Sequence, residues 1–76
     1  MASTTISPLT DRQAEVLEII RESLTDRGYP PTIREISRRL GVHISATVGH
    51  LEALAKKGYI ERDEGVTRGI RILRYT

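Results

Sequence analysis

The sequence contains no cysteine and no long apolar run, and each absence excludes a class of protein. Without cysteine there is no disulfide and no thiolate metal site. The apolar runs are only two or three residues long, so no segment is suited to span a membrane. The opening MASTTIS lacks the basic start and apolar centre of a signal peptide. We therefore expect a cytoplasmic protein in which residues 1–8 form a flexible polar arm.

Residues suited to catalysis are also scarce. The only histidines, His43 and His50, are seven positions apart. That separation is about 10 Å along a helix, too far for two ligands of one metal ion. There is no glycine-rich phosphate loop and no pair of carboxylates on an apolar stretch. The sequence therefore predicts no enzyme, metal, cofactor or small-molecule ligand.

Charge is distributed unevenly along the chain. Its 76 residues suffice for one small domain with a net charge of +2. Residues 1–32 hold three arginines and five acidic residues, whereas residues 33–76 hold nine lysines or arginines and five acidic residues. A basic excess in the second half suits contact with phosphates. Taken alone, it fits an ordinary solvated surface equally well.

Two capping boxes predict where the first two helices begin. In T-D-R-Q, the Thr10 hydroxyl can accept from the backbone N–H of Gln13, and the Gln13 side chain can reach back. In T-I-R-E, Thr32 and Glu35 can pair in the same way. Two prolines between these helices prevent them from joining.

Glycines at positions 28, 41 and 58 predict the ends of three helices. The third helix is expected to begin near Ile44 or Ser45, with Ser45 or His43 as N-cap, and to run to about Lys57. Helical spacing predicts that its buried face is formed by Ile44, Val48, Leu51 and Ala55, with Leu54 beside them.

The pattern changes after residue 58 to that of two short strands. The pattern predicts strands at residues 59–62 and 69–73 and a turn at residues 63–65. Ile70 and Ile72 would share one face and Arg71 the other. Because a lone hairpin is unstable, it must pack on the helices. Three helices and a hairpin predict a mainly α fold with a small β-hairpin, the winged helix-turn-helix, over residues 9–76.

The stretch from Thr32 to Leu54 has the spacing of a helix-turn-helix, whose second helix normally lies in the DNA major groove. Small side chains on helix three would allow close approach to DNA and contact with thymine methyl groups. Gly49 inside this helix lowers helix stability by about 1 kcal/mol relative to alanine. Either the helix simply tolerates this loss, or the glycine allows the helix backbone to approach DNA closely. No Arg, Asn or Gln on this face can read a base with two bonds. The predicted base-facing residues are Ser45, Ala46, Thr47, Gly49 and His50.

Phosphate contacts are expected to surround this helix. Helix two crosses the DNA backbone in this geometry, helix three ends in two lysines, and the hairpin carries two arginines. Each of these side chains could instead be merely solvated. The predicted phosphate-facing residues are Thr32, Arg34, Arg38, Arg39, His43, Lys56, Lys57, Arg68 and Arg71.

Three segments together resemble the N-terminal DNA-binding domain of LexA-type SOS repressors: LTDRQAEVLEIIRESLTDRGYPPTIREISRRLG, HLEALAKKGYIERD and TRGIRIL. They cover about residues 9–74 in one order. The resemblance implies a repressor that binds palindromic operators in double-stranded DNA as a dimer, with helix three in the groove. Between Gly41 and His50 this chain is one residue shorter than typical members. Counting back from His50 puts the family's base-reading positions at Ser45, Ala46 and Gly49, where other members carry polar or acidic residues.

LexA-type repressors also have a self-cleaving serine-lysine peptidase domain that drives dimerisation. This chain has no room for it, so it is expected to be either an excised domain or a small stand-alone regulator. Two alternatives remain open. The winged helix could serve protein contacts only, since fold does not settle function. The domain could also associate weakly or not at all when free and pair only on DNA.

Overall fold

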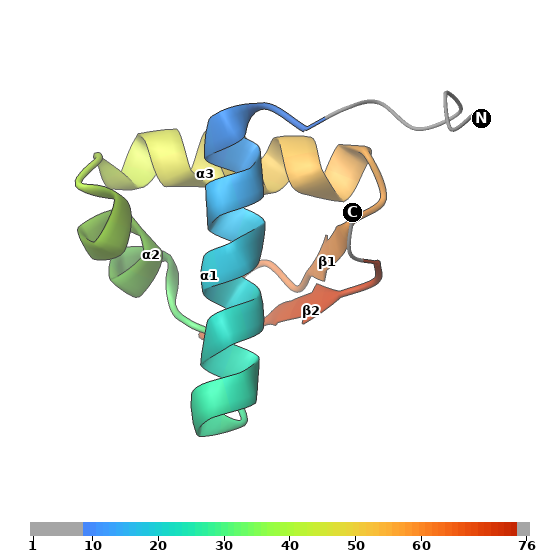
Figure 1. Ribbon diagram of the computed structural model, residues 1–76. Coiled ribbons are helices and arrows are strands. Elements are labelled where there is room, and N and C mark those ends of the chain that lie inside the picture. Colours follow the sequence, from blue (N-terminus) through green and yellow to red (C-terminus); the bar gives the residue numbers. More distant parts are fainter. Residues whose placement is uncertain (1–8, 75–76) are drawn as a thin grey trace.

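The computed structural model describes residues 9–74, which form three helices and two strands in the predicted order (Figure 1). The predicted arm, residues 1–8, lies outside the described residues. No helix within residues 9–74 has both the length and the apolar character that crossing a membrane requires. The elements are α1 (Asp11–Arg27), α2 (Ile33–Leu40), α3 (Ile44–Lys56), β1 (Ile60–Arg62) and β2 (Ile70–Ile72).

Both predicted capping boxes are confirmed. The Thr10 hydroxyl accepts from the Gln13 backbone N–H at 3.1 Å, and the Gln13 side chain accepts from the Thr10 N–H at 3.2 Å. Thr32 and Glu35 form the same reciprocal pair at the start of α2, with both distances at 3.0 Å. Each box satisfies backbone donors that a helix start otherwise leaves unpaired. The two helices therefore begin where local sequence fixes them.

A tight turn joins α2 to α3. Gly41 has a φ of 73°, the left-handed region that glycine adopts without steric penalty. Its N–H and that of Val42 both donate to the Ser37 carbonyl, at 2.8 and 3.1 Å. The chain thus leaves α2 sharply, and only three residues separate α2 from α3, as a helix-turn-helix requires.

The apolar core lies where α1 runs across α3, with α2 packed beside both (Figure 1). Burial of apolar side chains here is the main force that holds the helices together. The buried apolar residues are Val16, Leu17, Ile19, Ile20, Ile36, Leu51, Leu54, Tyr59, Ile60 and Ile70.

The hairpin joins this core through one face of its antiparallel strands. Ile60 pairs with Ile72, and Arg62 pairs with Ile70. Ile60 and Ile70 are buried, whereas Arg71 is exposed on the opposite face. The predicted strand faces are therefore confirmed, although each strand is shorter than expected. Packing on the helices supplies the stability that two strands lack.

The loop of the hairpin, residues 63–69, closes on its own backbone. The Asp63 N–H donates to the Gly69 carbonyl at 2.8 Å, and the N–H groups of Val66 and Gly69 donate within the loop at 3.2 and 3.1 Å. A Cβ added at Gly69 would lie 2.9 Å from the Asp63 carbonyl oxygen. Only glycine allows this close approach, so Gly69 holds the base of the loop shut.

The predicted buried face of α3 is confirmed at Leu51 and Leu54 and wrong at Ile44. Leu51 and Leu54 are fully buried as expected, but the third fully buried side chain is Thr47, and Ile44 is 43% exposed. Thr47, Leu51 and Leu54 have the same helical spacing as the predicted stripe. The packed face of α3 therefore includes a threonine that contacts α2, whereas Ile44, the first residue of the helix, remains exposed.

Candidate DNA interface

The exposed side of α3 carries small side chains. Ser45, Ala46 and Gly49 are exposed, and His50 is half-buried. His43 occupies the N-cap position, but its side chain makes no capping bond, so Ser45 lies within the first turn of the helix. A Cβ at Gly49 would meet no atom within 4 Å. The surface around Gly49 is thus open, and internal packing does not explain the glycine.

Thr47 is a correction to the predicted base-facing set. Its side chain has no exposed area, and its hydroxyl lies 2.7 Å from the Ser37 hydroxyl on α2, which is also buried. Either oxygen can donate in this bond. Because a buried hydroxyl needs a partner, the pair ties α2 to α3 at a fixed position. Thr47 thus fixes the geometry of the motif and cannot reach a partner at the surface.

Ile44 is a surface residue that the sequence analysis assigned to the core. Together with the exposed Val66 it lines an open cleft of about 350 Å³ between the starts of α2 and α3 and the hairpin loop. Arg34 and Arg68 line the same cleft. Ile44 has regular helical spacing with Thr47 and Leu51, so the sequence pattern alone predicts its burial. Its exposure comes from its position as the first residue of α3, where it borders the open cleft. Side chains near the start of a recognition helix are the ones that reach base edges.

The predicted phosphate-facing cations fall into two groups, and the first has no partner within residues 9–74. Arg34, Arg38 and Lys56 are exposed, and none of them bonds to another group within residues 9–74. Arg34 and Arg38 are one helical turn apart on α2, so they share a side of that helix. These three cations are available to a phosphate without breaking any bond in the described part of the protein.

The second group is engaged within the protein. Arg39 pairs with Glu22 on α1 at 2.9 Å, and Arg71 pairs with Glu61 across the hairpin. The Lys57 ammonium donates to the Gln13 side chain at 2.7 Å. Exposed pairs such as Arg39–Glu22 contribute little free energy, so a phosphate can compete for them.

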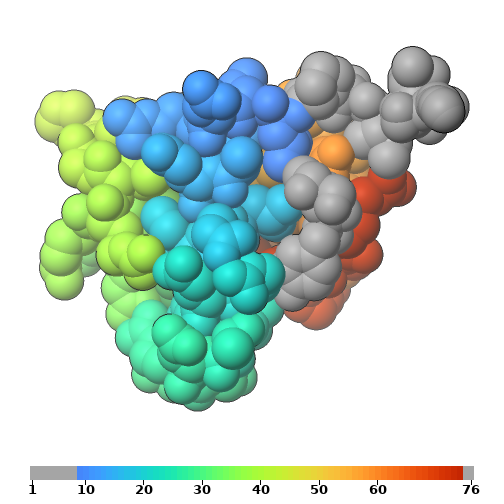
Figure 2. Space-filling model, in the orientation of Figure 1, coloured from blue at the N-terminus to red at the C-terminus, as the bar shows by residue number. Residues whose placement is uncertain are grey.

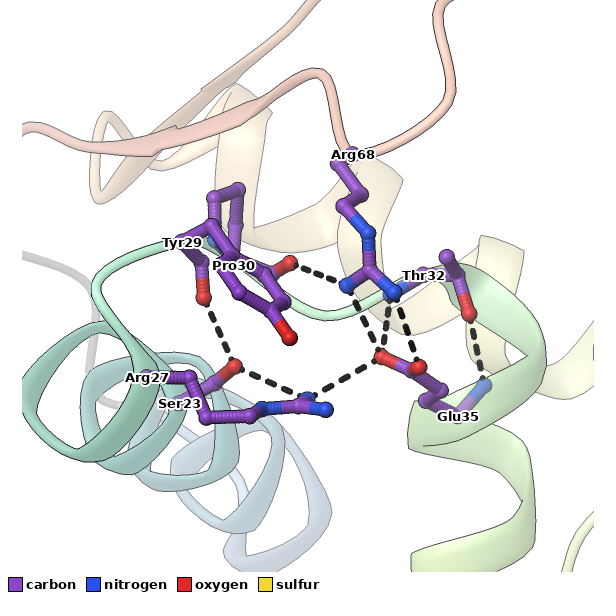
Figure 3. Close-up of polar contacts among 7 residues, drawn as sticks. All are labelled: Ser23, Arg27, Tyr29, Pro30, Thr32, Glu35 and Arg68. Carbon is purple, nitrogen blue, oxygen red and sulfur yellow. Dashed lines mark hydrogen bonds and ion pairs between the residues drawn. The ribbon is translucent and has the colours of Figure 1, made fainter.

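Arg68 makes the most extensive set of contacts (Figure 3). Its guanidinium forms two bonds with the Glu35 carboxylate, at 3.1 and 3.0 Å, and donates to the Pro30 carbonyl at 2.8 Å. It also lies over the Tyr29 ring, 4.6 Å from the centroid. Arg27 donates to the same Glu35 carboxylate at 3.2 Å. These contacts join the hairpin, the end of α1 and the start of α2.

The ionisation of Glu35 reflects this setting. The bonds from Arg68, followed by the backbone N–H within the Thr32 capping box, lower the pKa of Glu35 from 4.5 to about 2. The Arg68 pKa is raised in turn by Glu35. A depressed carboxyl pKa means that the interaction is present above pH 4.5 and is lost as the pH falls toward 2. The cluster is therefore fully charged at neutral pH.

The acidic residues of the described chain are most numerous on α1. The helix α1 carries five acidic residues and occupies most of the near face in Figure 2. The residues of α2 and the start of α3 project at the left edge of this view, and the hairpin lies at the right edge. The unpaired Arg34 and Arg38 belong to α2, and Lys56 ends α3. The helix-turn-helix thus combines free cations with a small-residue surface.

Comparisons with known proteins agree with this geometry. The chain matches the family described as LexA DNA binding domain over residues 6–69. It is 60% identical to a LexA repressor of Geobacter sp. (strain M21) over 67 residues, which are 84% of this chain and 32% of the relative. It is 56% identical to a LexA repressor of Shewanella piezotolerans over 66 residues, 86% of this chain and 32% of the relative. Against a LexA repressor of Aeromonas salmonicida the identity is 52% over 69 residues, 90% of this chain and 33% of the relative. The chain thus spans about a third of the length of these relatives.

Proposed function

The chain belongs to the LexA DNA-binding domain family, and from this premise we propose that it binds double-stranded DNA sequence-specifically and represses transcription. The observation that carries the proposal is a helix-turn-helix whose α3 exposes small side chains and which also exposes cations that have no partner within residues 9–74. A recognition helix needs both features, because phosphate contacts fix its register and base contacts select the sequence.

In the proposed complex, α3 lies in the major groove. The residues facing bases are Ser45, Ala46, Gly49 and His50, and Ile44 joins them as an apolar contact for a thymine methyl group. Three cations, Arg34, Arg38 and Lys56, meet phosphates on either side. The other members of the predicted set, Thr32, Arg39, His43, Lys57 and Arg71, contribute only where the DNA backbone comes within reach.

The protein is proposed to recognise a palindromic operator as a pair of domains. One domain contacts one half-site, and two domains joined or brought together on DNA bind far more tightly than one. Free in solution, the chain is proposed to associate weakly or not at all. The proposal places this repressor in the cytoplasm and gives it a binding role without catalysis by these residues.

Selection of bound sequences from a pool of random duplexes tests the proposal. We expect enrichment of an inverted repeat, and binding to it should weaken with salt along a slope of about −3 per domain if three phosphates are contacted. If the pool yields no enriched sequence, and random duplex competes as well as any selected one, sequence-specific binding is excluded. A winged helix that serves only protein contacts would behave in that way.

A charge-reversal pair identifies the surface that binds. Replacing Arg34 and Arg38 with glutamate, R34E/R38E, should abolish specific binding while the circular dichroism spectrum and the melting temperature are retained. The control with the same change in net charge is Arg12→Glu/Arg21→Glu, which reverses two arginines of α1. Equal losses in both proteins would mean that net charge, and not this surface, governs binding.

A further inference from the structure

Arg68 sits in a backbone conformation that calls for an explanation. Among the described residues it is the only one other than glycine with a positive φ, at 61°. Side chains with a Cβ adopt this region rarely because it brings Cβ close to the backbone. Such a conformation persists only where surrounding contacts hold it. The contacts that hold it here are those of the Arg68 guanidinium.

Those contacts extend through three elements of the fold. Figure 3 shows the Arg68 side chain reaching from the hairpin toward α2. Tyr29 lies under two guanidinium groups, with Arg27 at 5.0 Å and Arg68 at 4.6 Å from the ring centroid. The Tyr29 carbonyl accepts from the Ser23 hydroxyl at 2.8 Å. The network therefore starts on the hairpin and ends on α1, through the loop between α1 and α2.

We propose that Arg68 is a positioning residue for DNA binding: through Glu35, Pro30 and Tyr29 it holds the hairpin loop against the start of α2, so that the loop and the first turn of α3 meet DNA as one rigid surface. This inference rests on the function proposed above. It replaces the expectation that Arg68 contacts a phosphate, because three of its five N–H donors already bond to Glu35 and Pro30.

The shape of the cleft explains why this attachment matters for binding. Arg68 lies in the wall of the cleft that also contains Ile44 on α3 and Val66 on the loop. Both apolar side chains are exposed, so neither holds the loop in place by burial. The attachment at Arg68 thus fixes where Val66 stands relative to Ile44. Releasing it lets the loop move away from α3, and the two surfaces then reach DNA separately.

Substitution of Glu35 separates positioning from direct contact because the two mechanisms predict opposite signs. Glu35→Gln removes a negative charge and the ion pair but keeps the capping bonds of α2, since glutamine serves a capping box as well. If Arg68 contacts a phosphate, freeing it and removing a carboxylate should tighten binding. If Arg68 positions the loop, binding to the selected duplex should weaken roughly three- to thirtyfold, the usual range for residues that act without touching the ligand.

Two further variants complete the test. Arg68→Lys keeps the charge, which suffices for a phosphate, but lacks the planar fork that Glu35 and Pro30 require. It should weaken binding as much as Glu35→Gln, and the two losses should not add because both break the same attachment. The matched control, Glu22→Gln, removes a carboxylate from the exposed Arg39 pair and should leave binding unchanged or slightly tighter.

A distance measurement between two spin labels reports the position of the hairpin loop relative to α3 directly. The chain has no cysteine, so spin labels on Glu52→Cys in α3 and Thr67→Cys in the loop are the only labels present. The distance distribution should be narrow in the parent protein and broad with Glu35→Gln. Unchanged or tighter DNA binding by Glu35→Gln, full binding by Arg68→Lys, or an unchanged distribution would each overturn the inference. Absence of specific binding by the parent protein would instead refute the proposed function, and the distances alone would then decide whether Arg68 holds the loop.

Discussion

Helices α2 and α3 are neighbours in one motif, yet they are held by different means. The eight residues of α2 have a complete capping box at one end and Gly41 at the other. The thirteen residues of α3, Ile44–Lys56, are also followed by a left-handed glycine, Gly58, with a φ of 86°, but the N-cap residue His43 makes no side-chain bond. What α3 has instead is burial of Thr47, Leu51 and Leu54. Local sequence thus fixes both ends of α2, whereas the start of α3 depends on tertiary packing.

This difference suits a helix that reads DNA. Because one buried face holds α3, its outer side chains need not contribute to stability and are free to serve recognition. Capping, in contrast, fixes the bounds of α2 and so the position from which α3 starts. If this division is correct, substitutions should affect the two helices by different amounts and with different consequences for DNA binding.

The largest effect should come from the packing of α3. Leu51→Ala deletes a fully buried side chain and should reduce the free energy of unfolding by about 2–5 kcal/mol. Urea denaturation followed by far-ultraviolet circular dichroism measures the change. A loss below about 1 kcal/mol, in the range of surface substitutions, would mean that packing does not hold α3.

The next largest effect concerns the bond between the two helices. Thr47→Val keeps the shape but leaves the buried Ser37 hydroxyl without its partner, which should cost about 1–3 kcal/mol. The double variant Ser37→Ala/Thr47→Val removes both polar groups and should recover most of that loss in the same denaturation experiment. If the loss of stability in the double variant equals the sum of the losses in the two single variants, the bond between the two hydroxyl groups does not explain the effect of Thr47→Val.

A smaller effect is expected at the start of α2. Thr32→Ala removes the cap and should lower stability by about 1 kcal/mol. Thr25→Ala serves as the control because Thr25 is exposed within α1, where alanine is the better helix former. Thermal melts that rank the two variants equally would show that α2 does not depend on its cap.

The smallest change in stability should have the opposite sign. Gly49→Ala should stabilise α3 by up to about 1 kcal/mol, because alanine favours the helix and its Cβ meets nothing within the described structure. Binding to the selected duplex should weaken, since the methyl group would keep the backbone away from DNA. Titration of labelled duplex with the protein measures the affinity. An unchanged affinity would mean that Gly49 has no role in binding and is merely tolerated by the helix.

The fold could be predicted from sequence because most of its signals are local. The boxes at Thr10 and Thr32 each need only four consecutive residues, and the glycine after α2 needs one. The orientation of α3 could not be predicted in the same way. A threonine reads as polar, and its burial depends on Ser37, which lies ten residues away on another helix.

In the candidate site, too, the features that depend on local sequence could be predicted, and those that depend on distant contacts could not. Exposure of Ser45, Ala46 and Gly49 follows from their place on the helix, and the structure agrees. The partner of Arg68 lies 33 residues earlier in the chain, at Glu35, and no local pattern reports such a pair. Basic side chains can be counted from a sequence, but only the fold shows which of them are already engaged.

The closed loop between the strands has a consequence for how such a domain can change over generations. Residues 64–67 are all exposed, while Asp63 and Gly69 hold the loop at its base and Arg68 anchors it from outside. Exposed loop tips tolerate substitution and insertion better than any other part of a fold. The side chains of Glu64 and Thr67 can therefore vary without shifting the strand register. A descendant could acquire a new operator preference there while keeping α3 intact, and a designer could graft a sequence at the same place.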